Sequence, residues 1–176
     1  MARALATSEY GRRRQECEEG ARILGSLDSG VRTLRDVNSP FFESHKSSLP
    51  EIIRKRTRFI IEENQRVMDF AAAVVRNDRE SMSRLCEGSF SGMRDLYEKT
   101  VPEMKRMYEA MTSASGAVAA RQSGGGFGGC MIAYVDANQV ECFSAHVREV
   151  YEEKTSITPT MYIAEPADEA GVLKDL

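Results

Sequence analysis

A run of glycines late in the chain limits the possible fold more than any other stretch of the sequence. Residues 124–129 read GGGFGG, which is five glycines in six positions. The segments on either side, residues 116–121 and 130–135, are small or apolar and suit β-strands. The run therefore predicts a loop between two strands, and an all-helical fold is excluded.

The chain before this loop follows the period of α-helices. Apolar residues recur at 3.6-residue spacing over residues 50–76, and Pro50 suits a first helical turn. Residues 31–37 suit a short strand, and residues 38–48 suit an irregular connection or one loose helical turn. Further helices are predicted over residues 12–24, 79–99 and 102–111.

After the loop, the pattern predicts one more helix and one more strand. Asp136 is a suitable N-cap for a helix that runs to about Glu153. Residues 157–163 suit a closing strand, and Pro159 places that strand at an edge or at its own start. Helices followed by a strand–strand–helix–strand unit predict a single α+β domain over residues 1–176, with an antiparallel sheet and several added helices.

Composition excludes several classes of protein. The chain has a formal net charge of −3, which argues against a nucleic-acid binder. No apolar run is long enough to cross a membrane. The spacing of the cysteines rules out a zinc site of the usual kind, and such scattered thiols predict a reduced, cytoplasmic protein. These cysteines are Cys17, Cys86, Cys130 and Cys142.

The glycine run itself has two interpretations. It satisfies the spacing of a dinucleotide-binding loop, but a strand follows it instead of a helix, so that interpretation fails. Glycines do allow positive φ and a close approach of backbone N–H groups to a ligand, and such N–H groups bind phosphate. The alternative is a flexible hairpin turn. Phe127 at the centre of the run favours an anchored loop.

Several segments together resemble one enzyme family. SGGGFGGC at residues 123–130 resembles the third signature motif of the galactokinase branch of the GHMP kinases. The segment from Ser8 to Glu18 resembles a Ser-x-Tyr-x-x-Arg-Arg-x-Glu-Cys segment of galactokinases. Two further landmarks, Leu34 to Val37 and Arg94 to Glu103, follow in family order. Departures at Gln122, Phe90 and Lys105 leave the exact sugar open.

The resemblance implies a fold and a missing partner. It implies the ferredoxin-like α+β fold of a GHMP kinase C-terminal domain. Galactokinases also have an N-terminal half, which carries a sugar-binding segment, a serine-rich ATP loop and a catalytic Asp, and none of these is found here. We therefore expect this chain to be the C-terminal domain alone, with its own N-terminal domain as partner. Its domain-facing surface would be apolar, and the isolated domain would self-associate.

The resemblance also implies a reaction and the residues that take part. The reaction is transfer of the γ-phosphoryl group of ATP to the anomeric hydroxyl of galactose, with ATP and Mg²⁺ bound mainly by the missing half. Tyr10 matches the tyrosine that contacts the sugar. The loop that shapes the cleft would consist of Ser123, Gly124, Gly125, Gly126, Gly128 and Gly129.

This chain offers no catalytic or metal-binding residue in a recognisable context, so the isolated chain is expected to be inactive. Two alternatives stay open at this point. The full protein could be a galactokinase-like sugar sensor or regulator, or a GHMP kinase for another sugar.

The remaining polar residues suggest structural roles. The basic clusters at residues 12–14 and 54–58 are interpreted as solvated helix faces, because neighbouring Glu residues balance their charge. His45 and His146 are isolated and are interpreted as surface or packing histidines. Cys130 is expected to be a buried thiol at a strand start. The last group, expected in the core or on a domain-facing surface, comprises Met104, Met107 and Met111.

Overall fold

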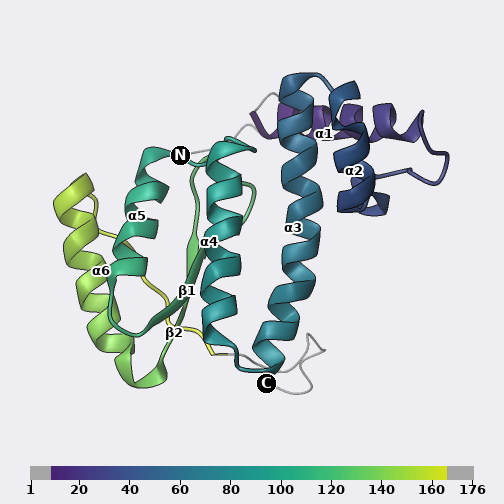
Figure 1. Cartoon of the computed structure of the whole chain (residues 1–176). Helices are drawn as coiled ribbons and strands as arrows, with labels where there is room; N and C mark the ends of the chain where they lie inside the picture. Colours follow the sequence, from purple (N-terminus) through teal and green to yellow (C-terminus); the bar gives the residue numbers. More distant parts are fainter. Residues whose placement is uncertain (1–8, 166–176) are drawn as a thin grey trace, which may run out of the picture.

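The computed structural model describes residues 9–165, which form six helices and one β-hairpin (Figure 1). Three short 3₁₀ turns lie at Leu34–Asp36, Lys46–Ser48 and Ala137–Gln139. The main elements are α1 (Glu9–Gly25), α2 (Ser39–His45), α3 (Glu51–Val75), α4 (Arg79–Asp95), α5 (Pro102–Ser113), β1 (Ala117–Gln122), β2 (Met131–Val135) and α6 (Val140–Thr155). Ser8, the first residue of one family-like segment, lies outside the described residues.

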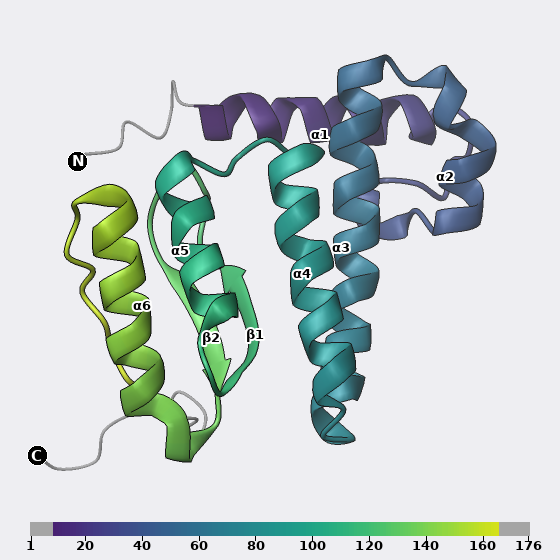
Figure 2. The ribbon, with the colours of Figure 1, turned by 60° about the vertical axis from the view of Figure 1, so that its left-hand side comes forward.

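The hairpin lies between two layers of helices. β1 and β2 pair antiparallel, with Ala120 opposite Ala133 and an irregularity between Ala117 and Ala119. Figure 2 shows α5 and α6 on one side of the hairpin and α4 on the other, with α3 beyond α4. β1 is covered on both sides, since Ala120 packs toward α5 and α6 while Val118 packs with residues of α3 and α4. The predicted α+β architecture with an antiparallel sheet is confirmed.

α1 and α2 lie at the far end of the molecule, against the N-terminal half of α3 (Figures 1 and 2). Buried apolar side chains of α1, α2 and α3 form their own core cluster there, which includes Leu24, Phe42 and Ile53. A second cluster, with Ala110, Phe143 and Val147, lies between the hairpin, α5 and α6. Each helix buries one apolar face in a cluster, and this face gives the 3.6-residue period from which the helices were predicted.

The strand predicted over residues 31–37 is wrong. This segment forms a 3₁₀ turn, and a capping box between Thr33 and Asp36 holds its start. Val31, Leu34 and Val37 are all buried. Val31 and Val37 lie on either side of the turn that contains Leu34, and this spacing of three residues does not fit a strand, which would alternate with a period of two.

The closing strand predicted over residues 157–163 is also wrong, because within residues 9–165 the sheet contains β1 and β2 alone. Ile157 and Ile163 are exposed, and of the large apolar side chains in this segment only Met161 packs against a core cluster. A strand gains its stability from such packing and from ladder hydrogen bonds, and Pro159 has no N–H to donate.

Two helix boundaries differ from the prediction. α4 ends at Asp95, and the N–H groups of Leu96 and Tyr97 both donate to the carbonyl of Gly92. Asp136 does not cap the last helix with its side chain, because both of its carboxylate oxygens accept hydrogen bonds of 2.6 Å from Arg79.

Within residues 9–165, no helix combines the length and the apolar character needed to cross a bilayer.

Candidate functional site

The structure brings Tyr10 and the glycine run together, although 113 or more residues separate them in the sequence. Tyr10 lies in the first turn of α1 and is 46% exposed. A Cβ atom built on Gly125 would lie 3.5 Å from Cδ2 of the Tyr10 ring. The ring therefore lies close beside the loop, at a distance where a methyl group on Gly125 would touch it.

The loop between β1 and β2 depends on glycine geometry. The φ angles of Gly124, Gly126, Gly128 and Gly129 lie between 80° and 110°, a region that L side chains rarely adopt. The N–H of Ser123 donates to the carbonyl of Cys130 at 2.9 Å and closes the base of the loop. Within residues 9–165, the glycine N–H groups of positions 124–126, 128 and 129 donate to no other backbone group outside regular elements. These N–H groups are thus available to an acceptor oxygen.

The glycine loop is anchored on the segment that follows α4. The N–H of Phe127 donates to the carbonyl of Lys99 at 2.8 Å. Gly126 is buried against the Lys99 side chain, whose aliphatic carbons lie 2.7–2.9 Å from the place of a Cβ atom. The loop is therefore held at its centre, and the anchored interpretation fits better than the flexible turn.

Arg13 joins α1 to the same segment. Its side chain is buried, its Nε donates to the carbonyl of Tyr97 at 2.7 Å, and its Nη2 donates to the carbonyl of Glu98 at 3.2 Å. Its guanidinium carbon lies 5.8 Å from the centre of the Phe127 ring, within the range of a cation–π contact. One arginine thus contacts the loop and its anchor.

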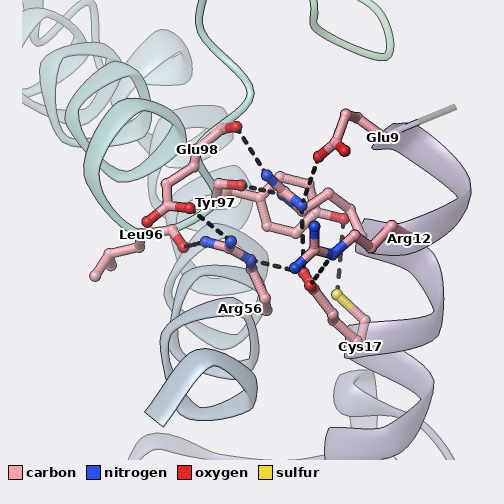
Figure 3. Close-up of polar contacts among 9 residues, drawn as sticks. Glu9, Arg12, Cys17, Arg56, Leu96, Tyr97 and Glu98 are labelled. Carbon is pink, nitrogen blue, oxygen red and sulfur yellow. Dashed lines mark hydrogen bonds and ion pairs between the residues drawn. The ribbon is translucent and has the colours of Figure 1, made fainter.

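Arg56 of α3 completes this buried polar cluster (Figure 3). It is 1% exposed, and its Nε donates to Glu16 at 2.9 Å while its Nη2 donates to Glu98 at 2.7 Å. Its Nη1 donates to the carbonyl of Leu96. Glu16 also accepts from Arg12 at 3.0 Å.

The interpretation of both basic clusters as solvated faces is therefore wrong at Arg13 and Arg56. These two arginines lie inside, where carboxylates and carbonyl groups compensate their charge. A weak signal for Arg13 was present in the sequence, since it shares a helix face with Glu16, Gly20 and Leu24, all of which are buried.

Burial and charge shift several pKa values at the site. Burial raises the pKa of the Tyr97 phenol, which lies 3.6 Å from the Cys17 sulfur, and burial also raises the pKa of that thiol. The hydrogen bond from Arg56 lowers the pKa of the Glu98 carboxyl. Burial lowers the pKa of the Lys99 ammonium. Glu98 therefore stays ionised at neutral pH, and Tyr97 and Cys17 stay protonated.

An open groove of about 820 Å³ runs beside Tyr10, between α1, the 3₁₀ turn at Leu34–Asp36 and α3. Its lining combines tyrosine, polar and charged side chains with apolar ones such as Ala21, Leu34 and Ile60, so it offers both hydrogen-bonding groups and apolar surface. It includes Tyr10, Tyr97, Asn64, Arg14, Arg32 and Arg35.

The other singled-out residues lie away from this site or outside the core. Cys130 is exposed, so the predicted buried thiol is wrong. His45 lies 2.9 Å from the Phe41 carbonyl, and His146 lies 3.0 Å from the Ser113 hydroxyl, as expected of packing histidines. Met104 and Met111 are buried, and Met107 is partly buried. Residues 9–165 contain no group of three or more His, Cys, Asp or Glu side chains arranged to hold a metal ion.

Comparison with known proteins connects this geometry to one family. A family model described as GHMP kinases C terminal matches residues 70–153. The chain is 35% identical over 175 residues to a galactokinase of Roseiflexus sp. (strain RS-1), and the match covers 99% of this chain and 45% of that protein.

A solved structure is similar over most of the described chain. The crystal structure of Lactococcus lactis galactokinase complexed with galactose matches with a TM-score of 0.82 and 29% sequence identity, covering 90% of this chain and 41% of that one. The chain thus spans less than half the length of the galactokinases that it matches. Residues 70–153 therefore form a GHMP kinase C-terminal domain, and the chain is similar to galactokinases along almost its whole length.

Proposed function

We propose that this chain is the C-terminal part of an ATP-dependent sugar kinase that phosphorylates galactose at its anomeric hydroxyl. The observation that carries the proposal is the proximity of Tyr10 to the glycine loop. The two segments that resemble galactokinases most closely lie side by side in space, although they are far apart in the sequence. The similarity to a galactokinase crystallised with galactose supports the choice of sugar.

Tyr10 and the loop have complementary roles in this proposal. The phenol hydroxyl donates to or accepts from a sugar hydroxyl, and the ring supplies an apolar face for the sugar C–H groups. The N–H groups of Gly124, Gly125 and their neighbours point their partial positive charge at oxygen atoms in the cleft. These groups orient the sugar, and the backbone approaches it closely because no Cβ atom intervenes.

ATP and Mg²⁺ fit this chain only in part. The glycine N–H groups suit phosphate or hydroxyl oxygens, whereas residues 9–165 offer no cluster of metal ligands. When bound, ATP supplies the phosphoryl group and Mg²⁺ neutralises part of its charge. We assign the metal and most nucleotide contacts to an N-terminal half, and the isolated chain is inactive for that reason.

One face of α3 offers a surface for that N-terminal half. Val67, Met68, Val74 and Val75 are all exposed and recur at i, i+1, i+7 and i+8, so they share one helix face. Exposed large apolar side chains on one face are typical of a surface that another domain covers. The free thiols at Cys17 and Cys86 agree with the reducing cytoplasm, where we place the protein.

The test is a kinase assay on the native polypeptide that contains this chain, purified from its source cells. Galactose-dependent release of ADP is expected, with slower or no release for N-acetylgalactosamine and arabinose. Preference for one of those sugars would assign another substrate. Sugar binding without any ADP release would mean a sensor or regulator instead of an enzyme.

Tyr10 offers a sharper test within the same assay. Replacing Tyr10 by Phe removes one hydrogen bond to the sugar, so KM for galactose should rise about tenfold, the equivalent of roughly 1.4 kcal/mol. Tyr134→Phe is the matched control, because Tyr134 is equally exposed but lies on β2. An equal effect of both variants, or none at Tyr10, would argue against a role of Tyr10 in sugar binding.

A further inference from the structure

The buried guanidinium of Arg13 stands between the two parts of the candidate site. Arg13 is 5% exposed. Within its own helix, its Nη1 lies 3.1 Å from Glu9 and 3.5 Å from Glu16. Toward the segment after α4 it donates to two successive carbonyl groups, those of Tyr97 and Glu98. These contacts use three different nitrogen atoms of one planar group.

Only an arginine can make this set of contacts. The guanidinium presents its donors in a rigid fork, so two of them reach neighbouring carbonyl groups while the third faces carboxylates. A lysine carries the same charge on a single nitrogen atom and cannot span the same set. Charge alone therefore does not account for an arginine at position 13.

The segment that Arg13 binds, residues 97–99, has a strained backbone and forms a hydrogen bond with the glycine loop. Glu98 has a φ of 55°, which is uncommon for a residue with a side chain. Such backbone persists when its surroundings fix it, and here Arg13 holds the Glu98 carbonyl while Arg56 holds its carboxylate. The next residue, Lys99, accepts the N–H of Phe127 at the centre of the glycine loop.

Arg13 also fixes the other side of the site. It lies three residues after Tyr10 in α1, so both side chains lie on neighbouring positions of one helix face. Any shift of α1 relative to the segment after α4 would move Tyr10 relative to Gly125. Because its guanidinium also lies near the Phe127 ring, Arg13 touches the helix, the anchor and the loop.

We infer that Arg13 is a positioning residue that sets the distance between Tyr10 and the glycine loop, through its bonds to the carbonyl groups of Tyr97 and Glu98. Arg13 itself contacts neither the sugar hydroxyl nor the phosphoryl group of the proposed reaction. The inference rests on the proposed function only for its consequence in sugar binding. Its structural part concerns this chain alone and can be tested without any enzymatic activity.

The first test is hydrogen exchange on this chain, in which the hydrogen-bonded loop amides of Ser123 and Phe127 are compared with amides of α6. In Arg13→Lys and Arg13→Gln, exchange in the loop should become about tenfold faster, as expected when one strong hydrogen bond is lost locally. Exchange in α6 should not change. Arg14→Gln is the control, because Arg14 is the next residue, is exposed, and pairs only with Glu18 within residues 9–165.

The outcomes separate the possibilities. Unchanged loop exchange in a folded Arg13→Lys variant would overturn the inference. So would equally faster exchange in the loop and in α6, because that result means global destabilisation. Should Arg13→Gln fail to fold, Arg13→Lys still decides, since it keeps the charge beside Glu9 and Glu16.

The second test applies to the longer native polypeptide. Arg13→Lys should raise KM for galactose about tenfold, while Arg148→Gln, at an exposed position of α6 outside the groove, should leave it unchanged. Absence of any kinase activity in the wild-type polypeptide would contradict the proposed function, yet the exchange result would still stand. Faster loop exchange with an unchanged KM would overturn the inferred link between Arg13 and sugar binding.

Discussion

Two buried arginines organise the polar interior near the glycine loop. Arg13 and Arg56 together hold the carbonyl groups of three successive residues, Leu96, Tyr97 and Glu98. Arg56 also forms a buried ion pair with Glu16. Removing one partner of a buried ion pair leaves the other charge without compensation, which lowers the free energy of unfolding by about 3–5 kcal/mol. The cluster therefore fixes the conformation of a segment that has no regular secondary structure of its own.

The conformation of the glycine loop can be tested at Gly126. Gly126→Ala should lower the free energy of unfolding by about 1–3 kcal/mol, because φ is 85° and a Cβ atom would meet the Lys99 side chain. Urea unfolding measures this change. Gly125→Ala is the control, since a Cβ atom there would lie at an ordinary contact distance from Tyr10. Equal losses in both variants would contradict the loop geometry described above.

The ion pair between Glu98 and Arg56 predicts a dependence of stability on pH. Arg56 lowers the pKa of Glu98 in the folded state, so this contribution is complete above the unfolded pKa of about 4.3. It is lost as the pH falls through the lower pKa of the folded state. Glu98→Gln should therefore reduce the change in unfolding free energy between about pH 5 and pH 3.

Denaturant unfolding at several pH values measures the effect. Glu153→Gln is the control, because Glu153 is exposed on α6 and forms no ion pair within residues 9–165. An unchanged acid dependence in Glu98→Gln would contradict the pairing with Arg56.

At the scale of elements, the close crossing of α1 and α3 positions Tyr10. Gly20 of α1 lies directly against the Thr57 hydroxyl of α3, and both residues are buried. The small residue lets the two helices approach until Arg56 reaches Glu16. The close packing of α1 against α3 therefore brings the partners of the buried ion pairs together and fixes the position of the first turn of α1.

This crossing predicts the effect of a methyl group at Gly20. Gly20→Ala should lower the free energy of unfolding by about 1–3 kcal/mol through overpacking, despite the better helix propensity of Ala. The control is Gly88→Ala in α4, where a Cβ atom would be 3.6 Å from Arg66, an ordinary contact. That variant should be neutral or gain up to about 1 kcal/mol. A Gly20→Ala variant at least as stable as wild type would contradict the crossing.

Elements with a strong period were predictable from the sequence. The helix predicted over residues 50–76 corresponds to α3, and the two strands around the glycine run correspond to β1 and β2. The segments over residues 31–37 and 157–163 were not predictable in this way. Short apolar segments satisfy several periods at once, and tertiary packing decides among them.

The candidate site was predictable only in part. Tyr10 and the glycines were identified through a family resemblance, and the structure brings them together. Arg13 and Arg56 were missed, because a run of charged residues is typical of an exposed surface and the helix face of Arg13 gave only a weak signal of burial. Their burial depends on Glu16 and Glu98, which come from different elements.

At the scale of the whole molecule, the helices and the hairpin of residues 9–165 pack in layers, but one apolar face of α3 is exposed to solvent. Met68 is 68% exposed and Val75 is 87% exposed. The chain corresponds to less than half of the galactokinases that it matches. In the proposed function, this face of α3 is the surface that an N-terminal half would cover.

Without that half, the isolated chain should self-associate through α3. Its apparent mass in size-exclusion chromatography with light scattering should rise with concentration. Met68→Lys with Val75→Lys should restore a monomer, because the added charges cannot be buried in an apolar contact. The control adds the same charges elsewhere, with Ser83→Lys and Ala145→Lys, both at exposed positions. A wild-type chain that stays monomeric at all concentrations would contradict this role of α3.

The proposed function requires this chain to be one part of a longer sugar kinase. The most direct test is the intact mass of the native polypeptide in its source cells, detected through a peptide of this chain. A polypeptide of about twice the 19.6 kDa of this chain is the predicted result, since the chain covers 45% of a related galactokinase. A native polypeptide of 19.6 kDa would contradict the claim and would direct attention to a separate partner protein.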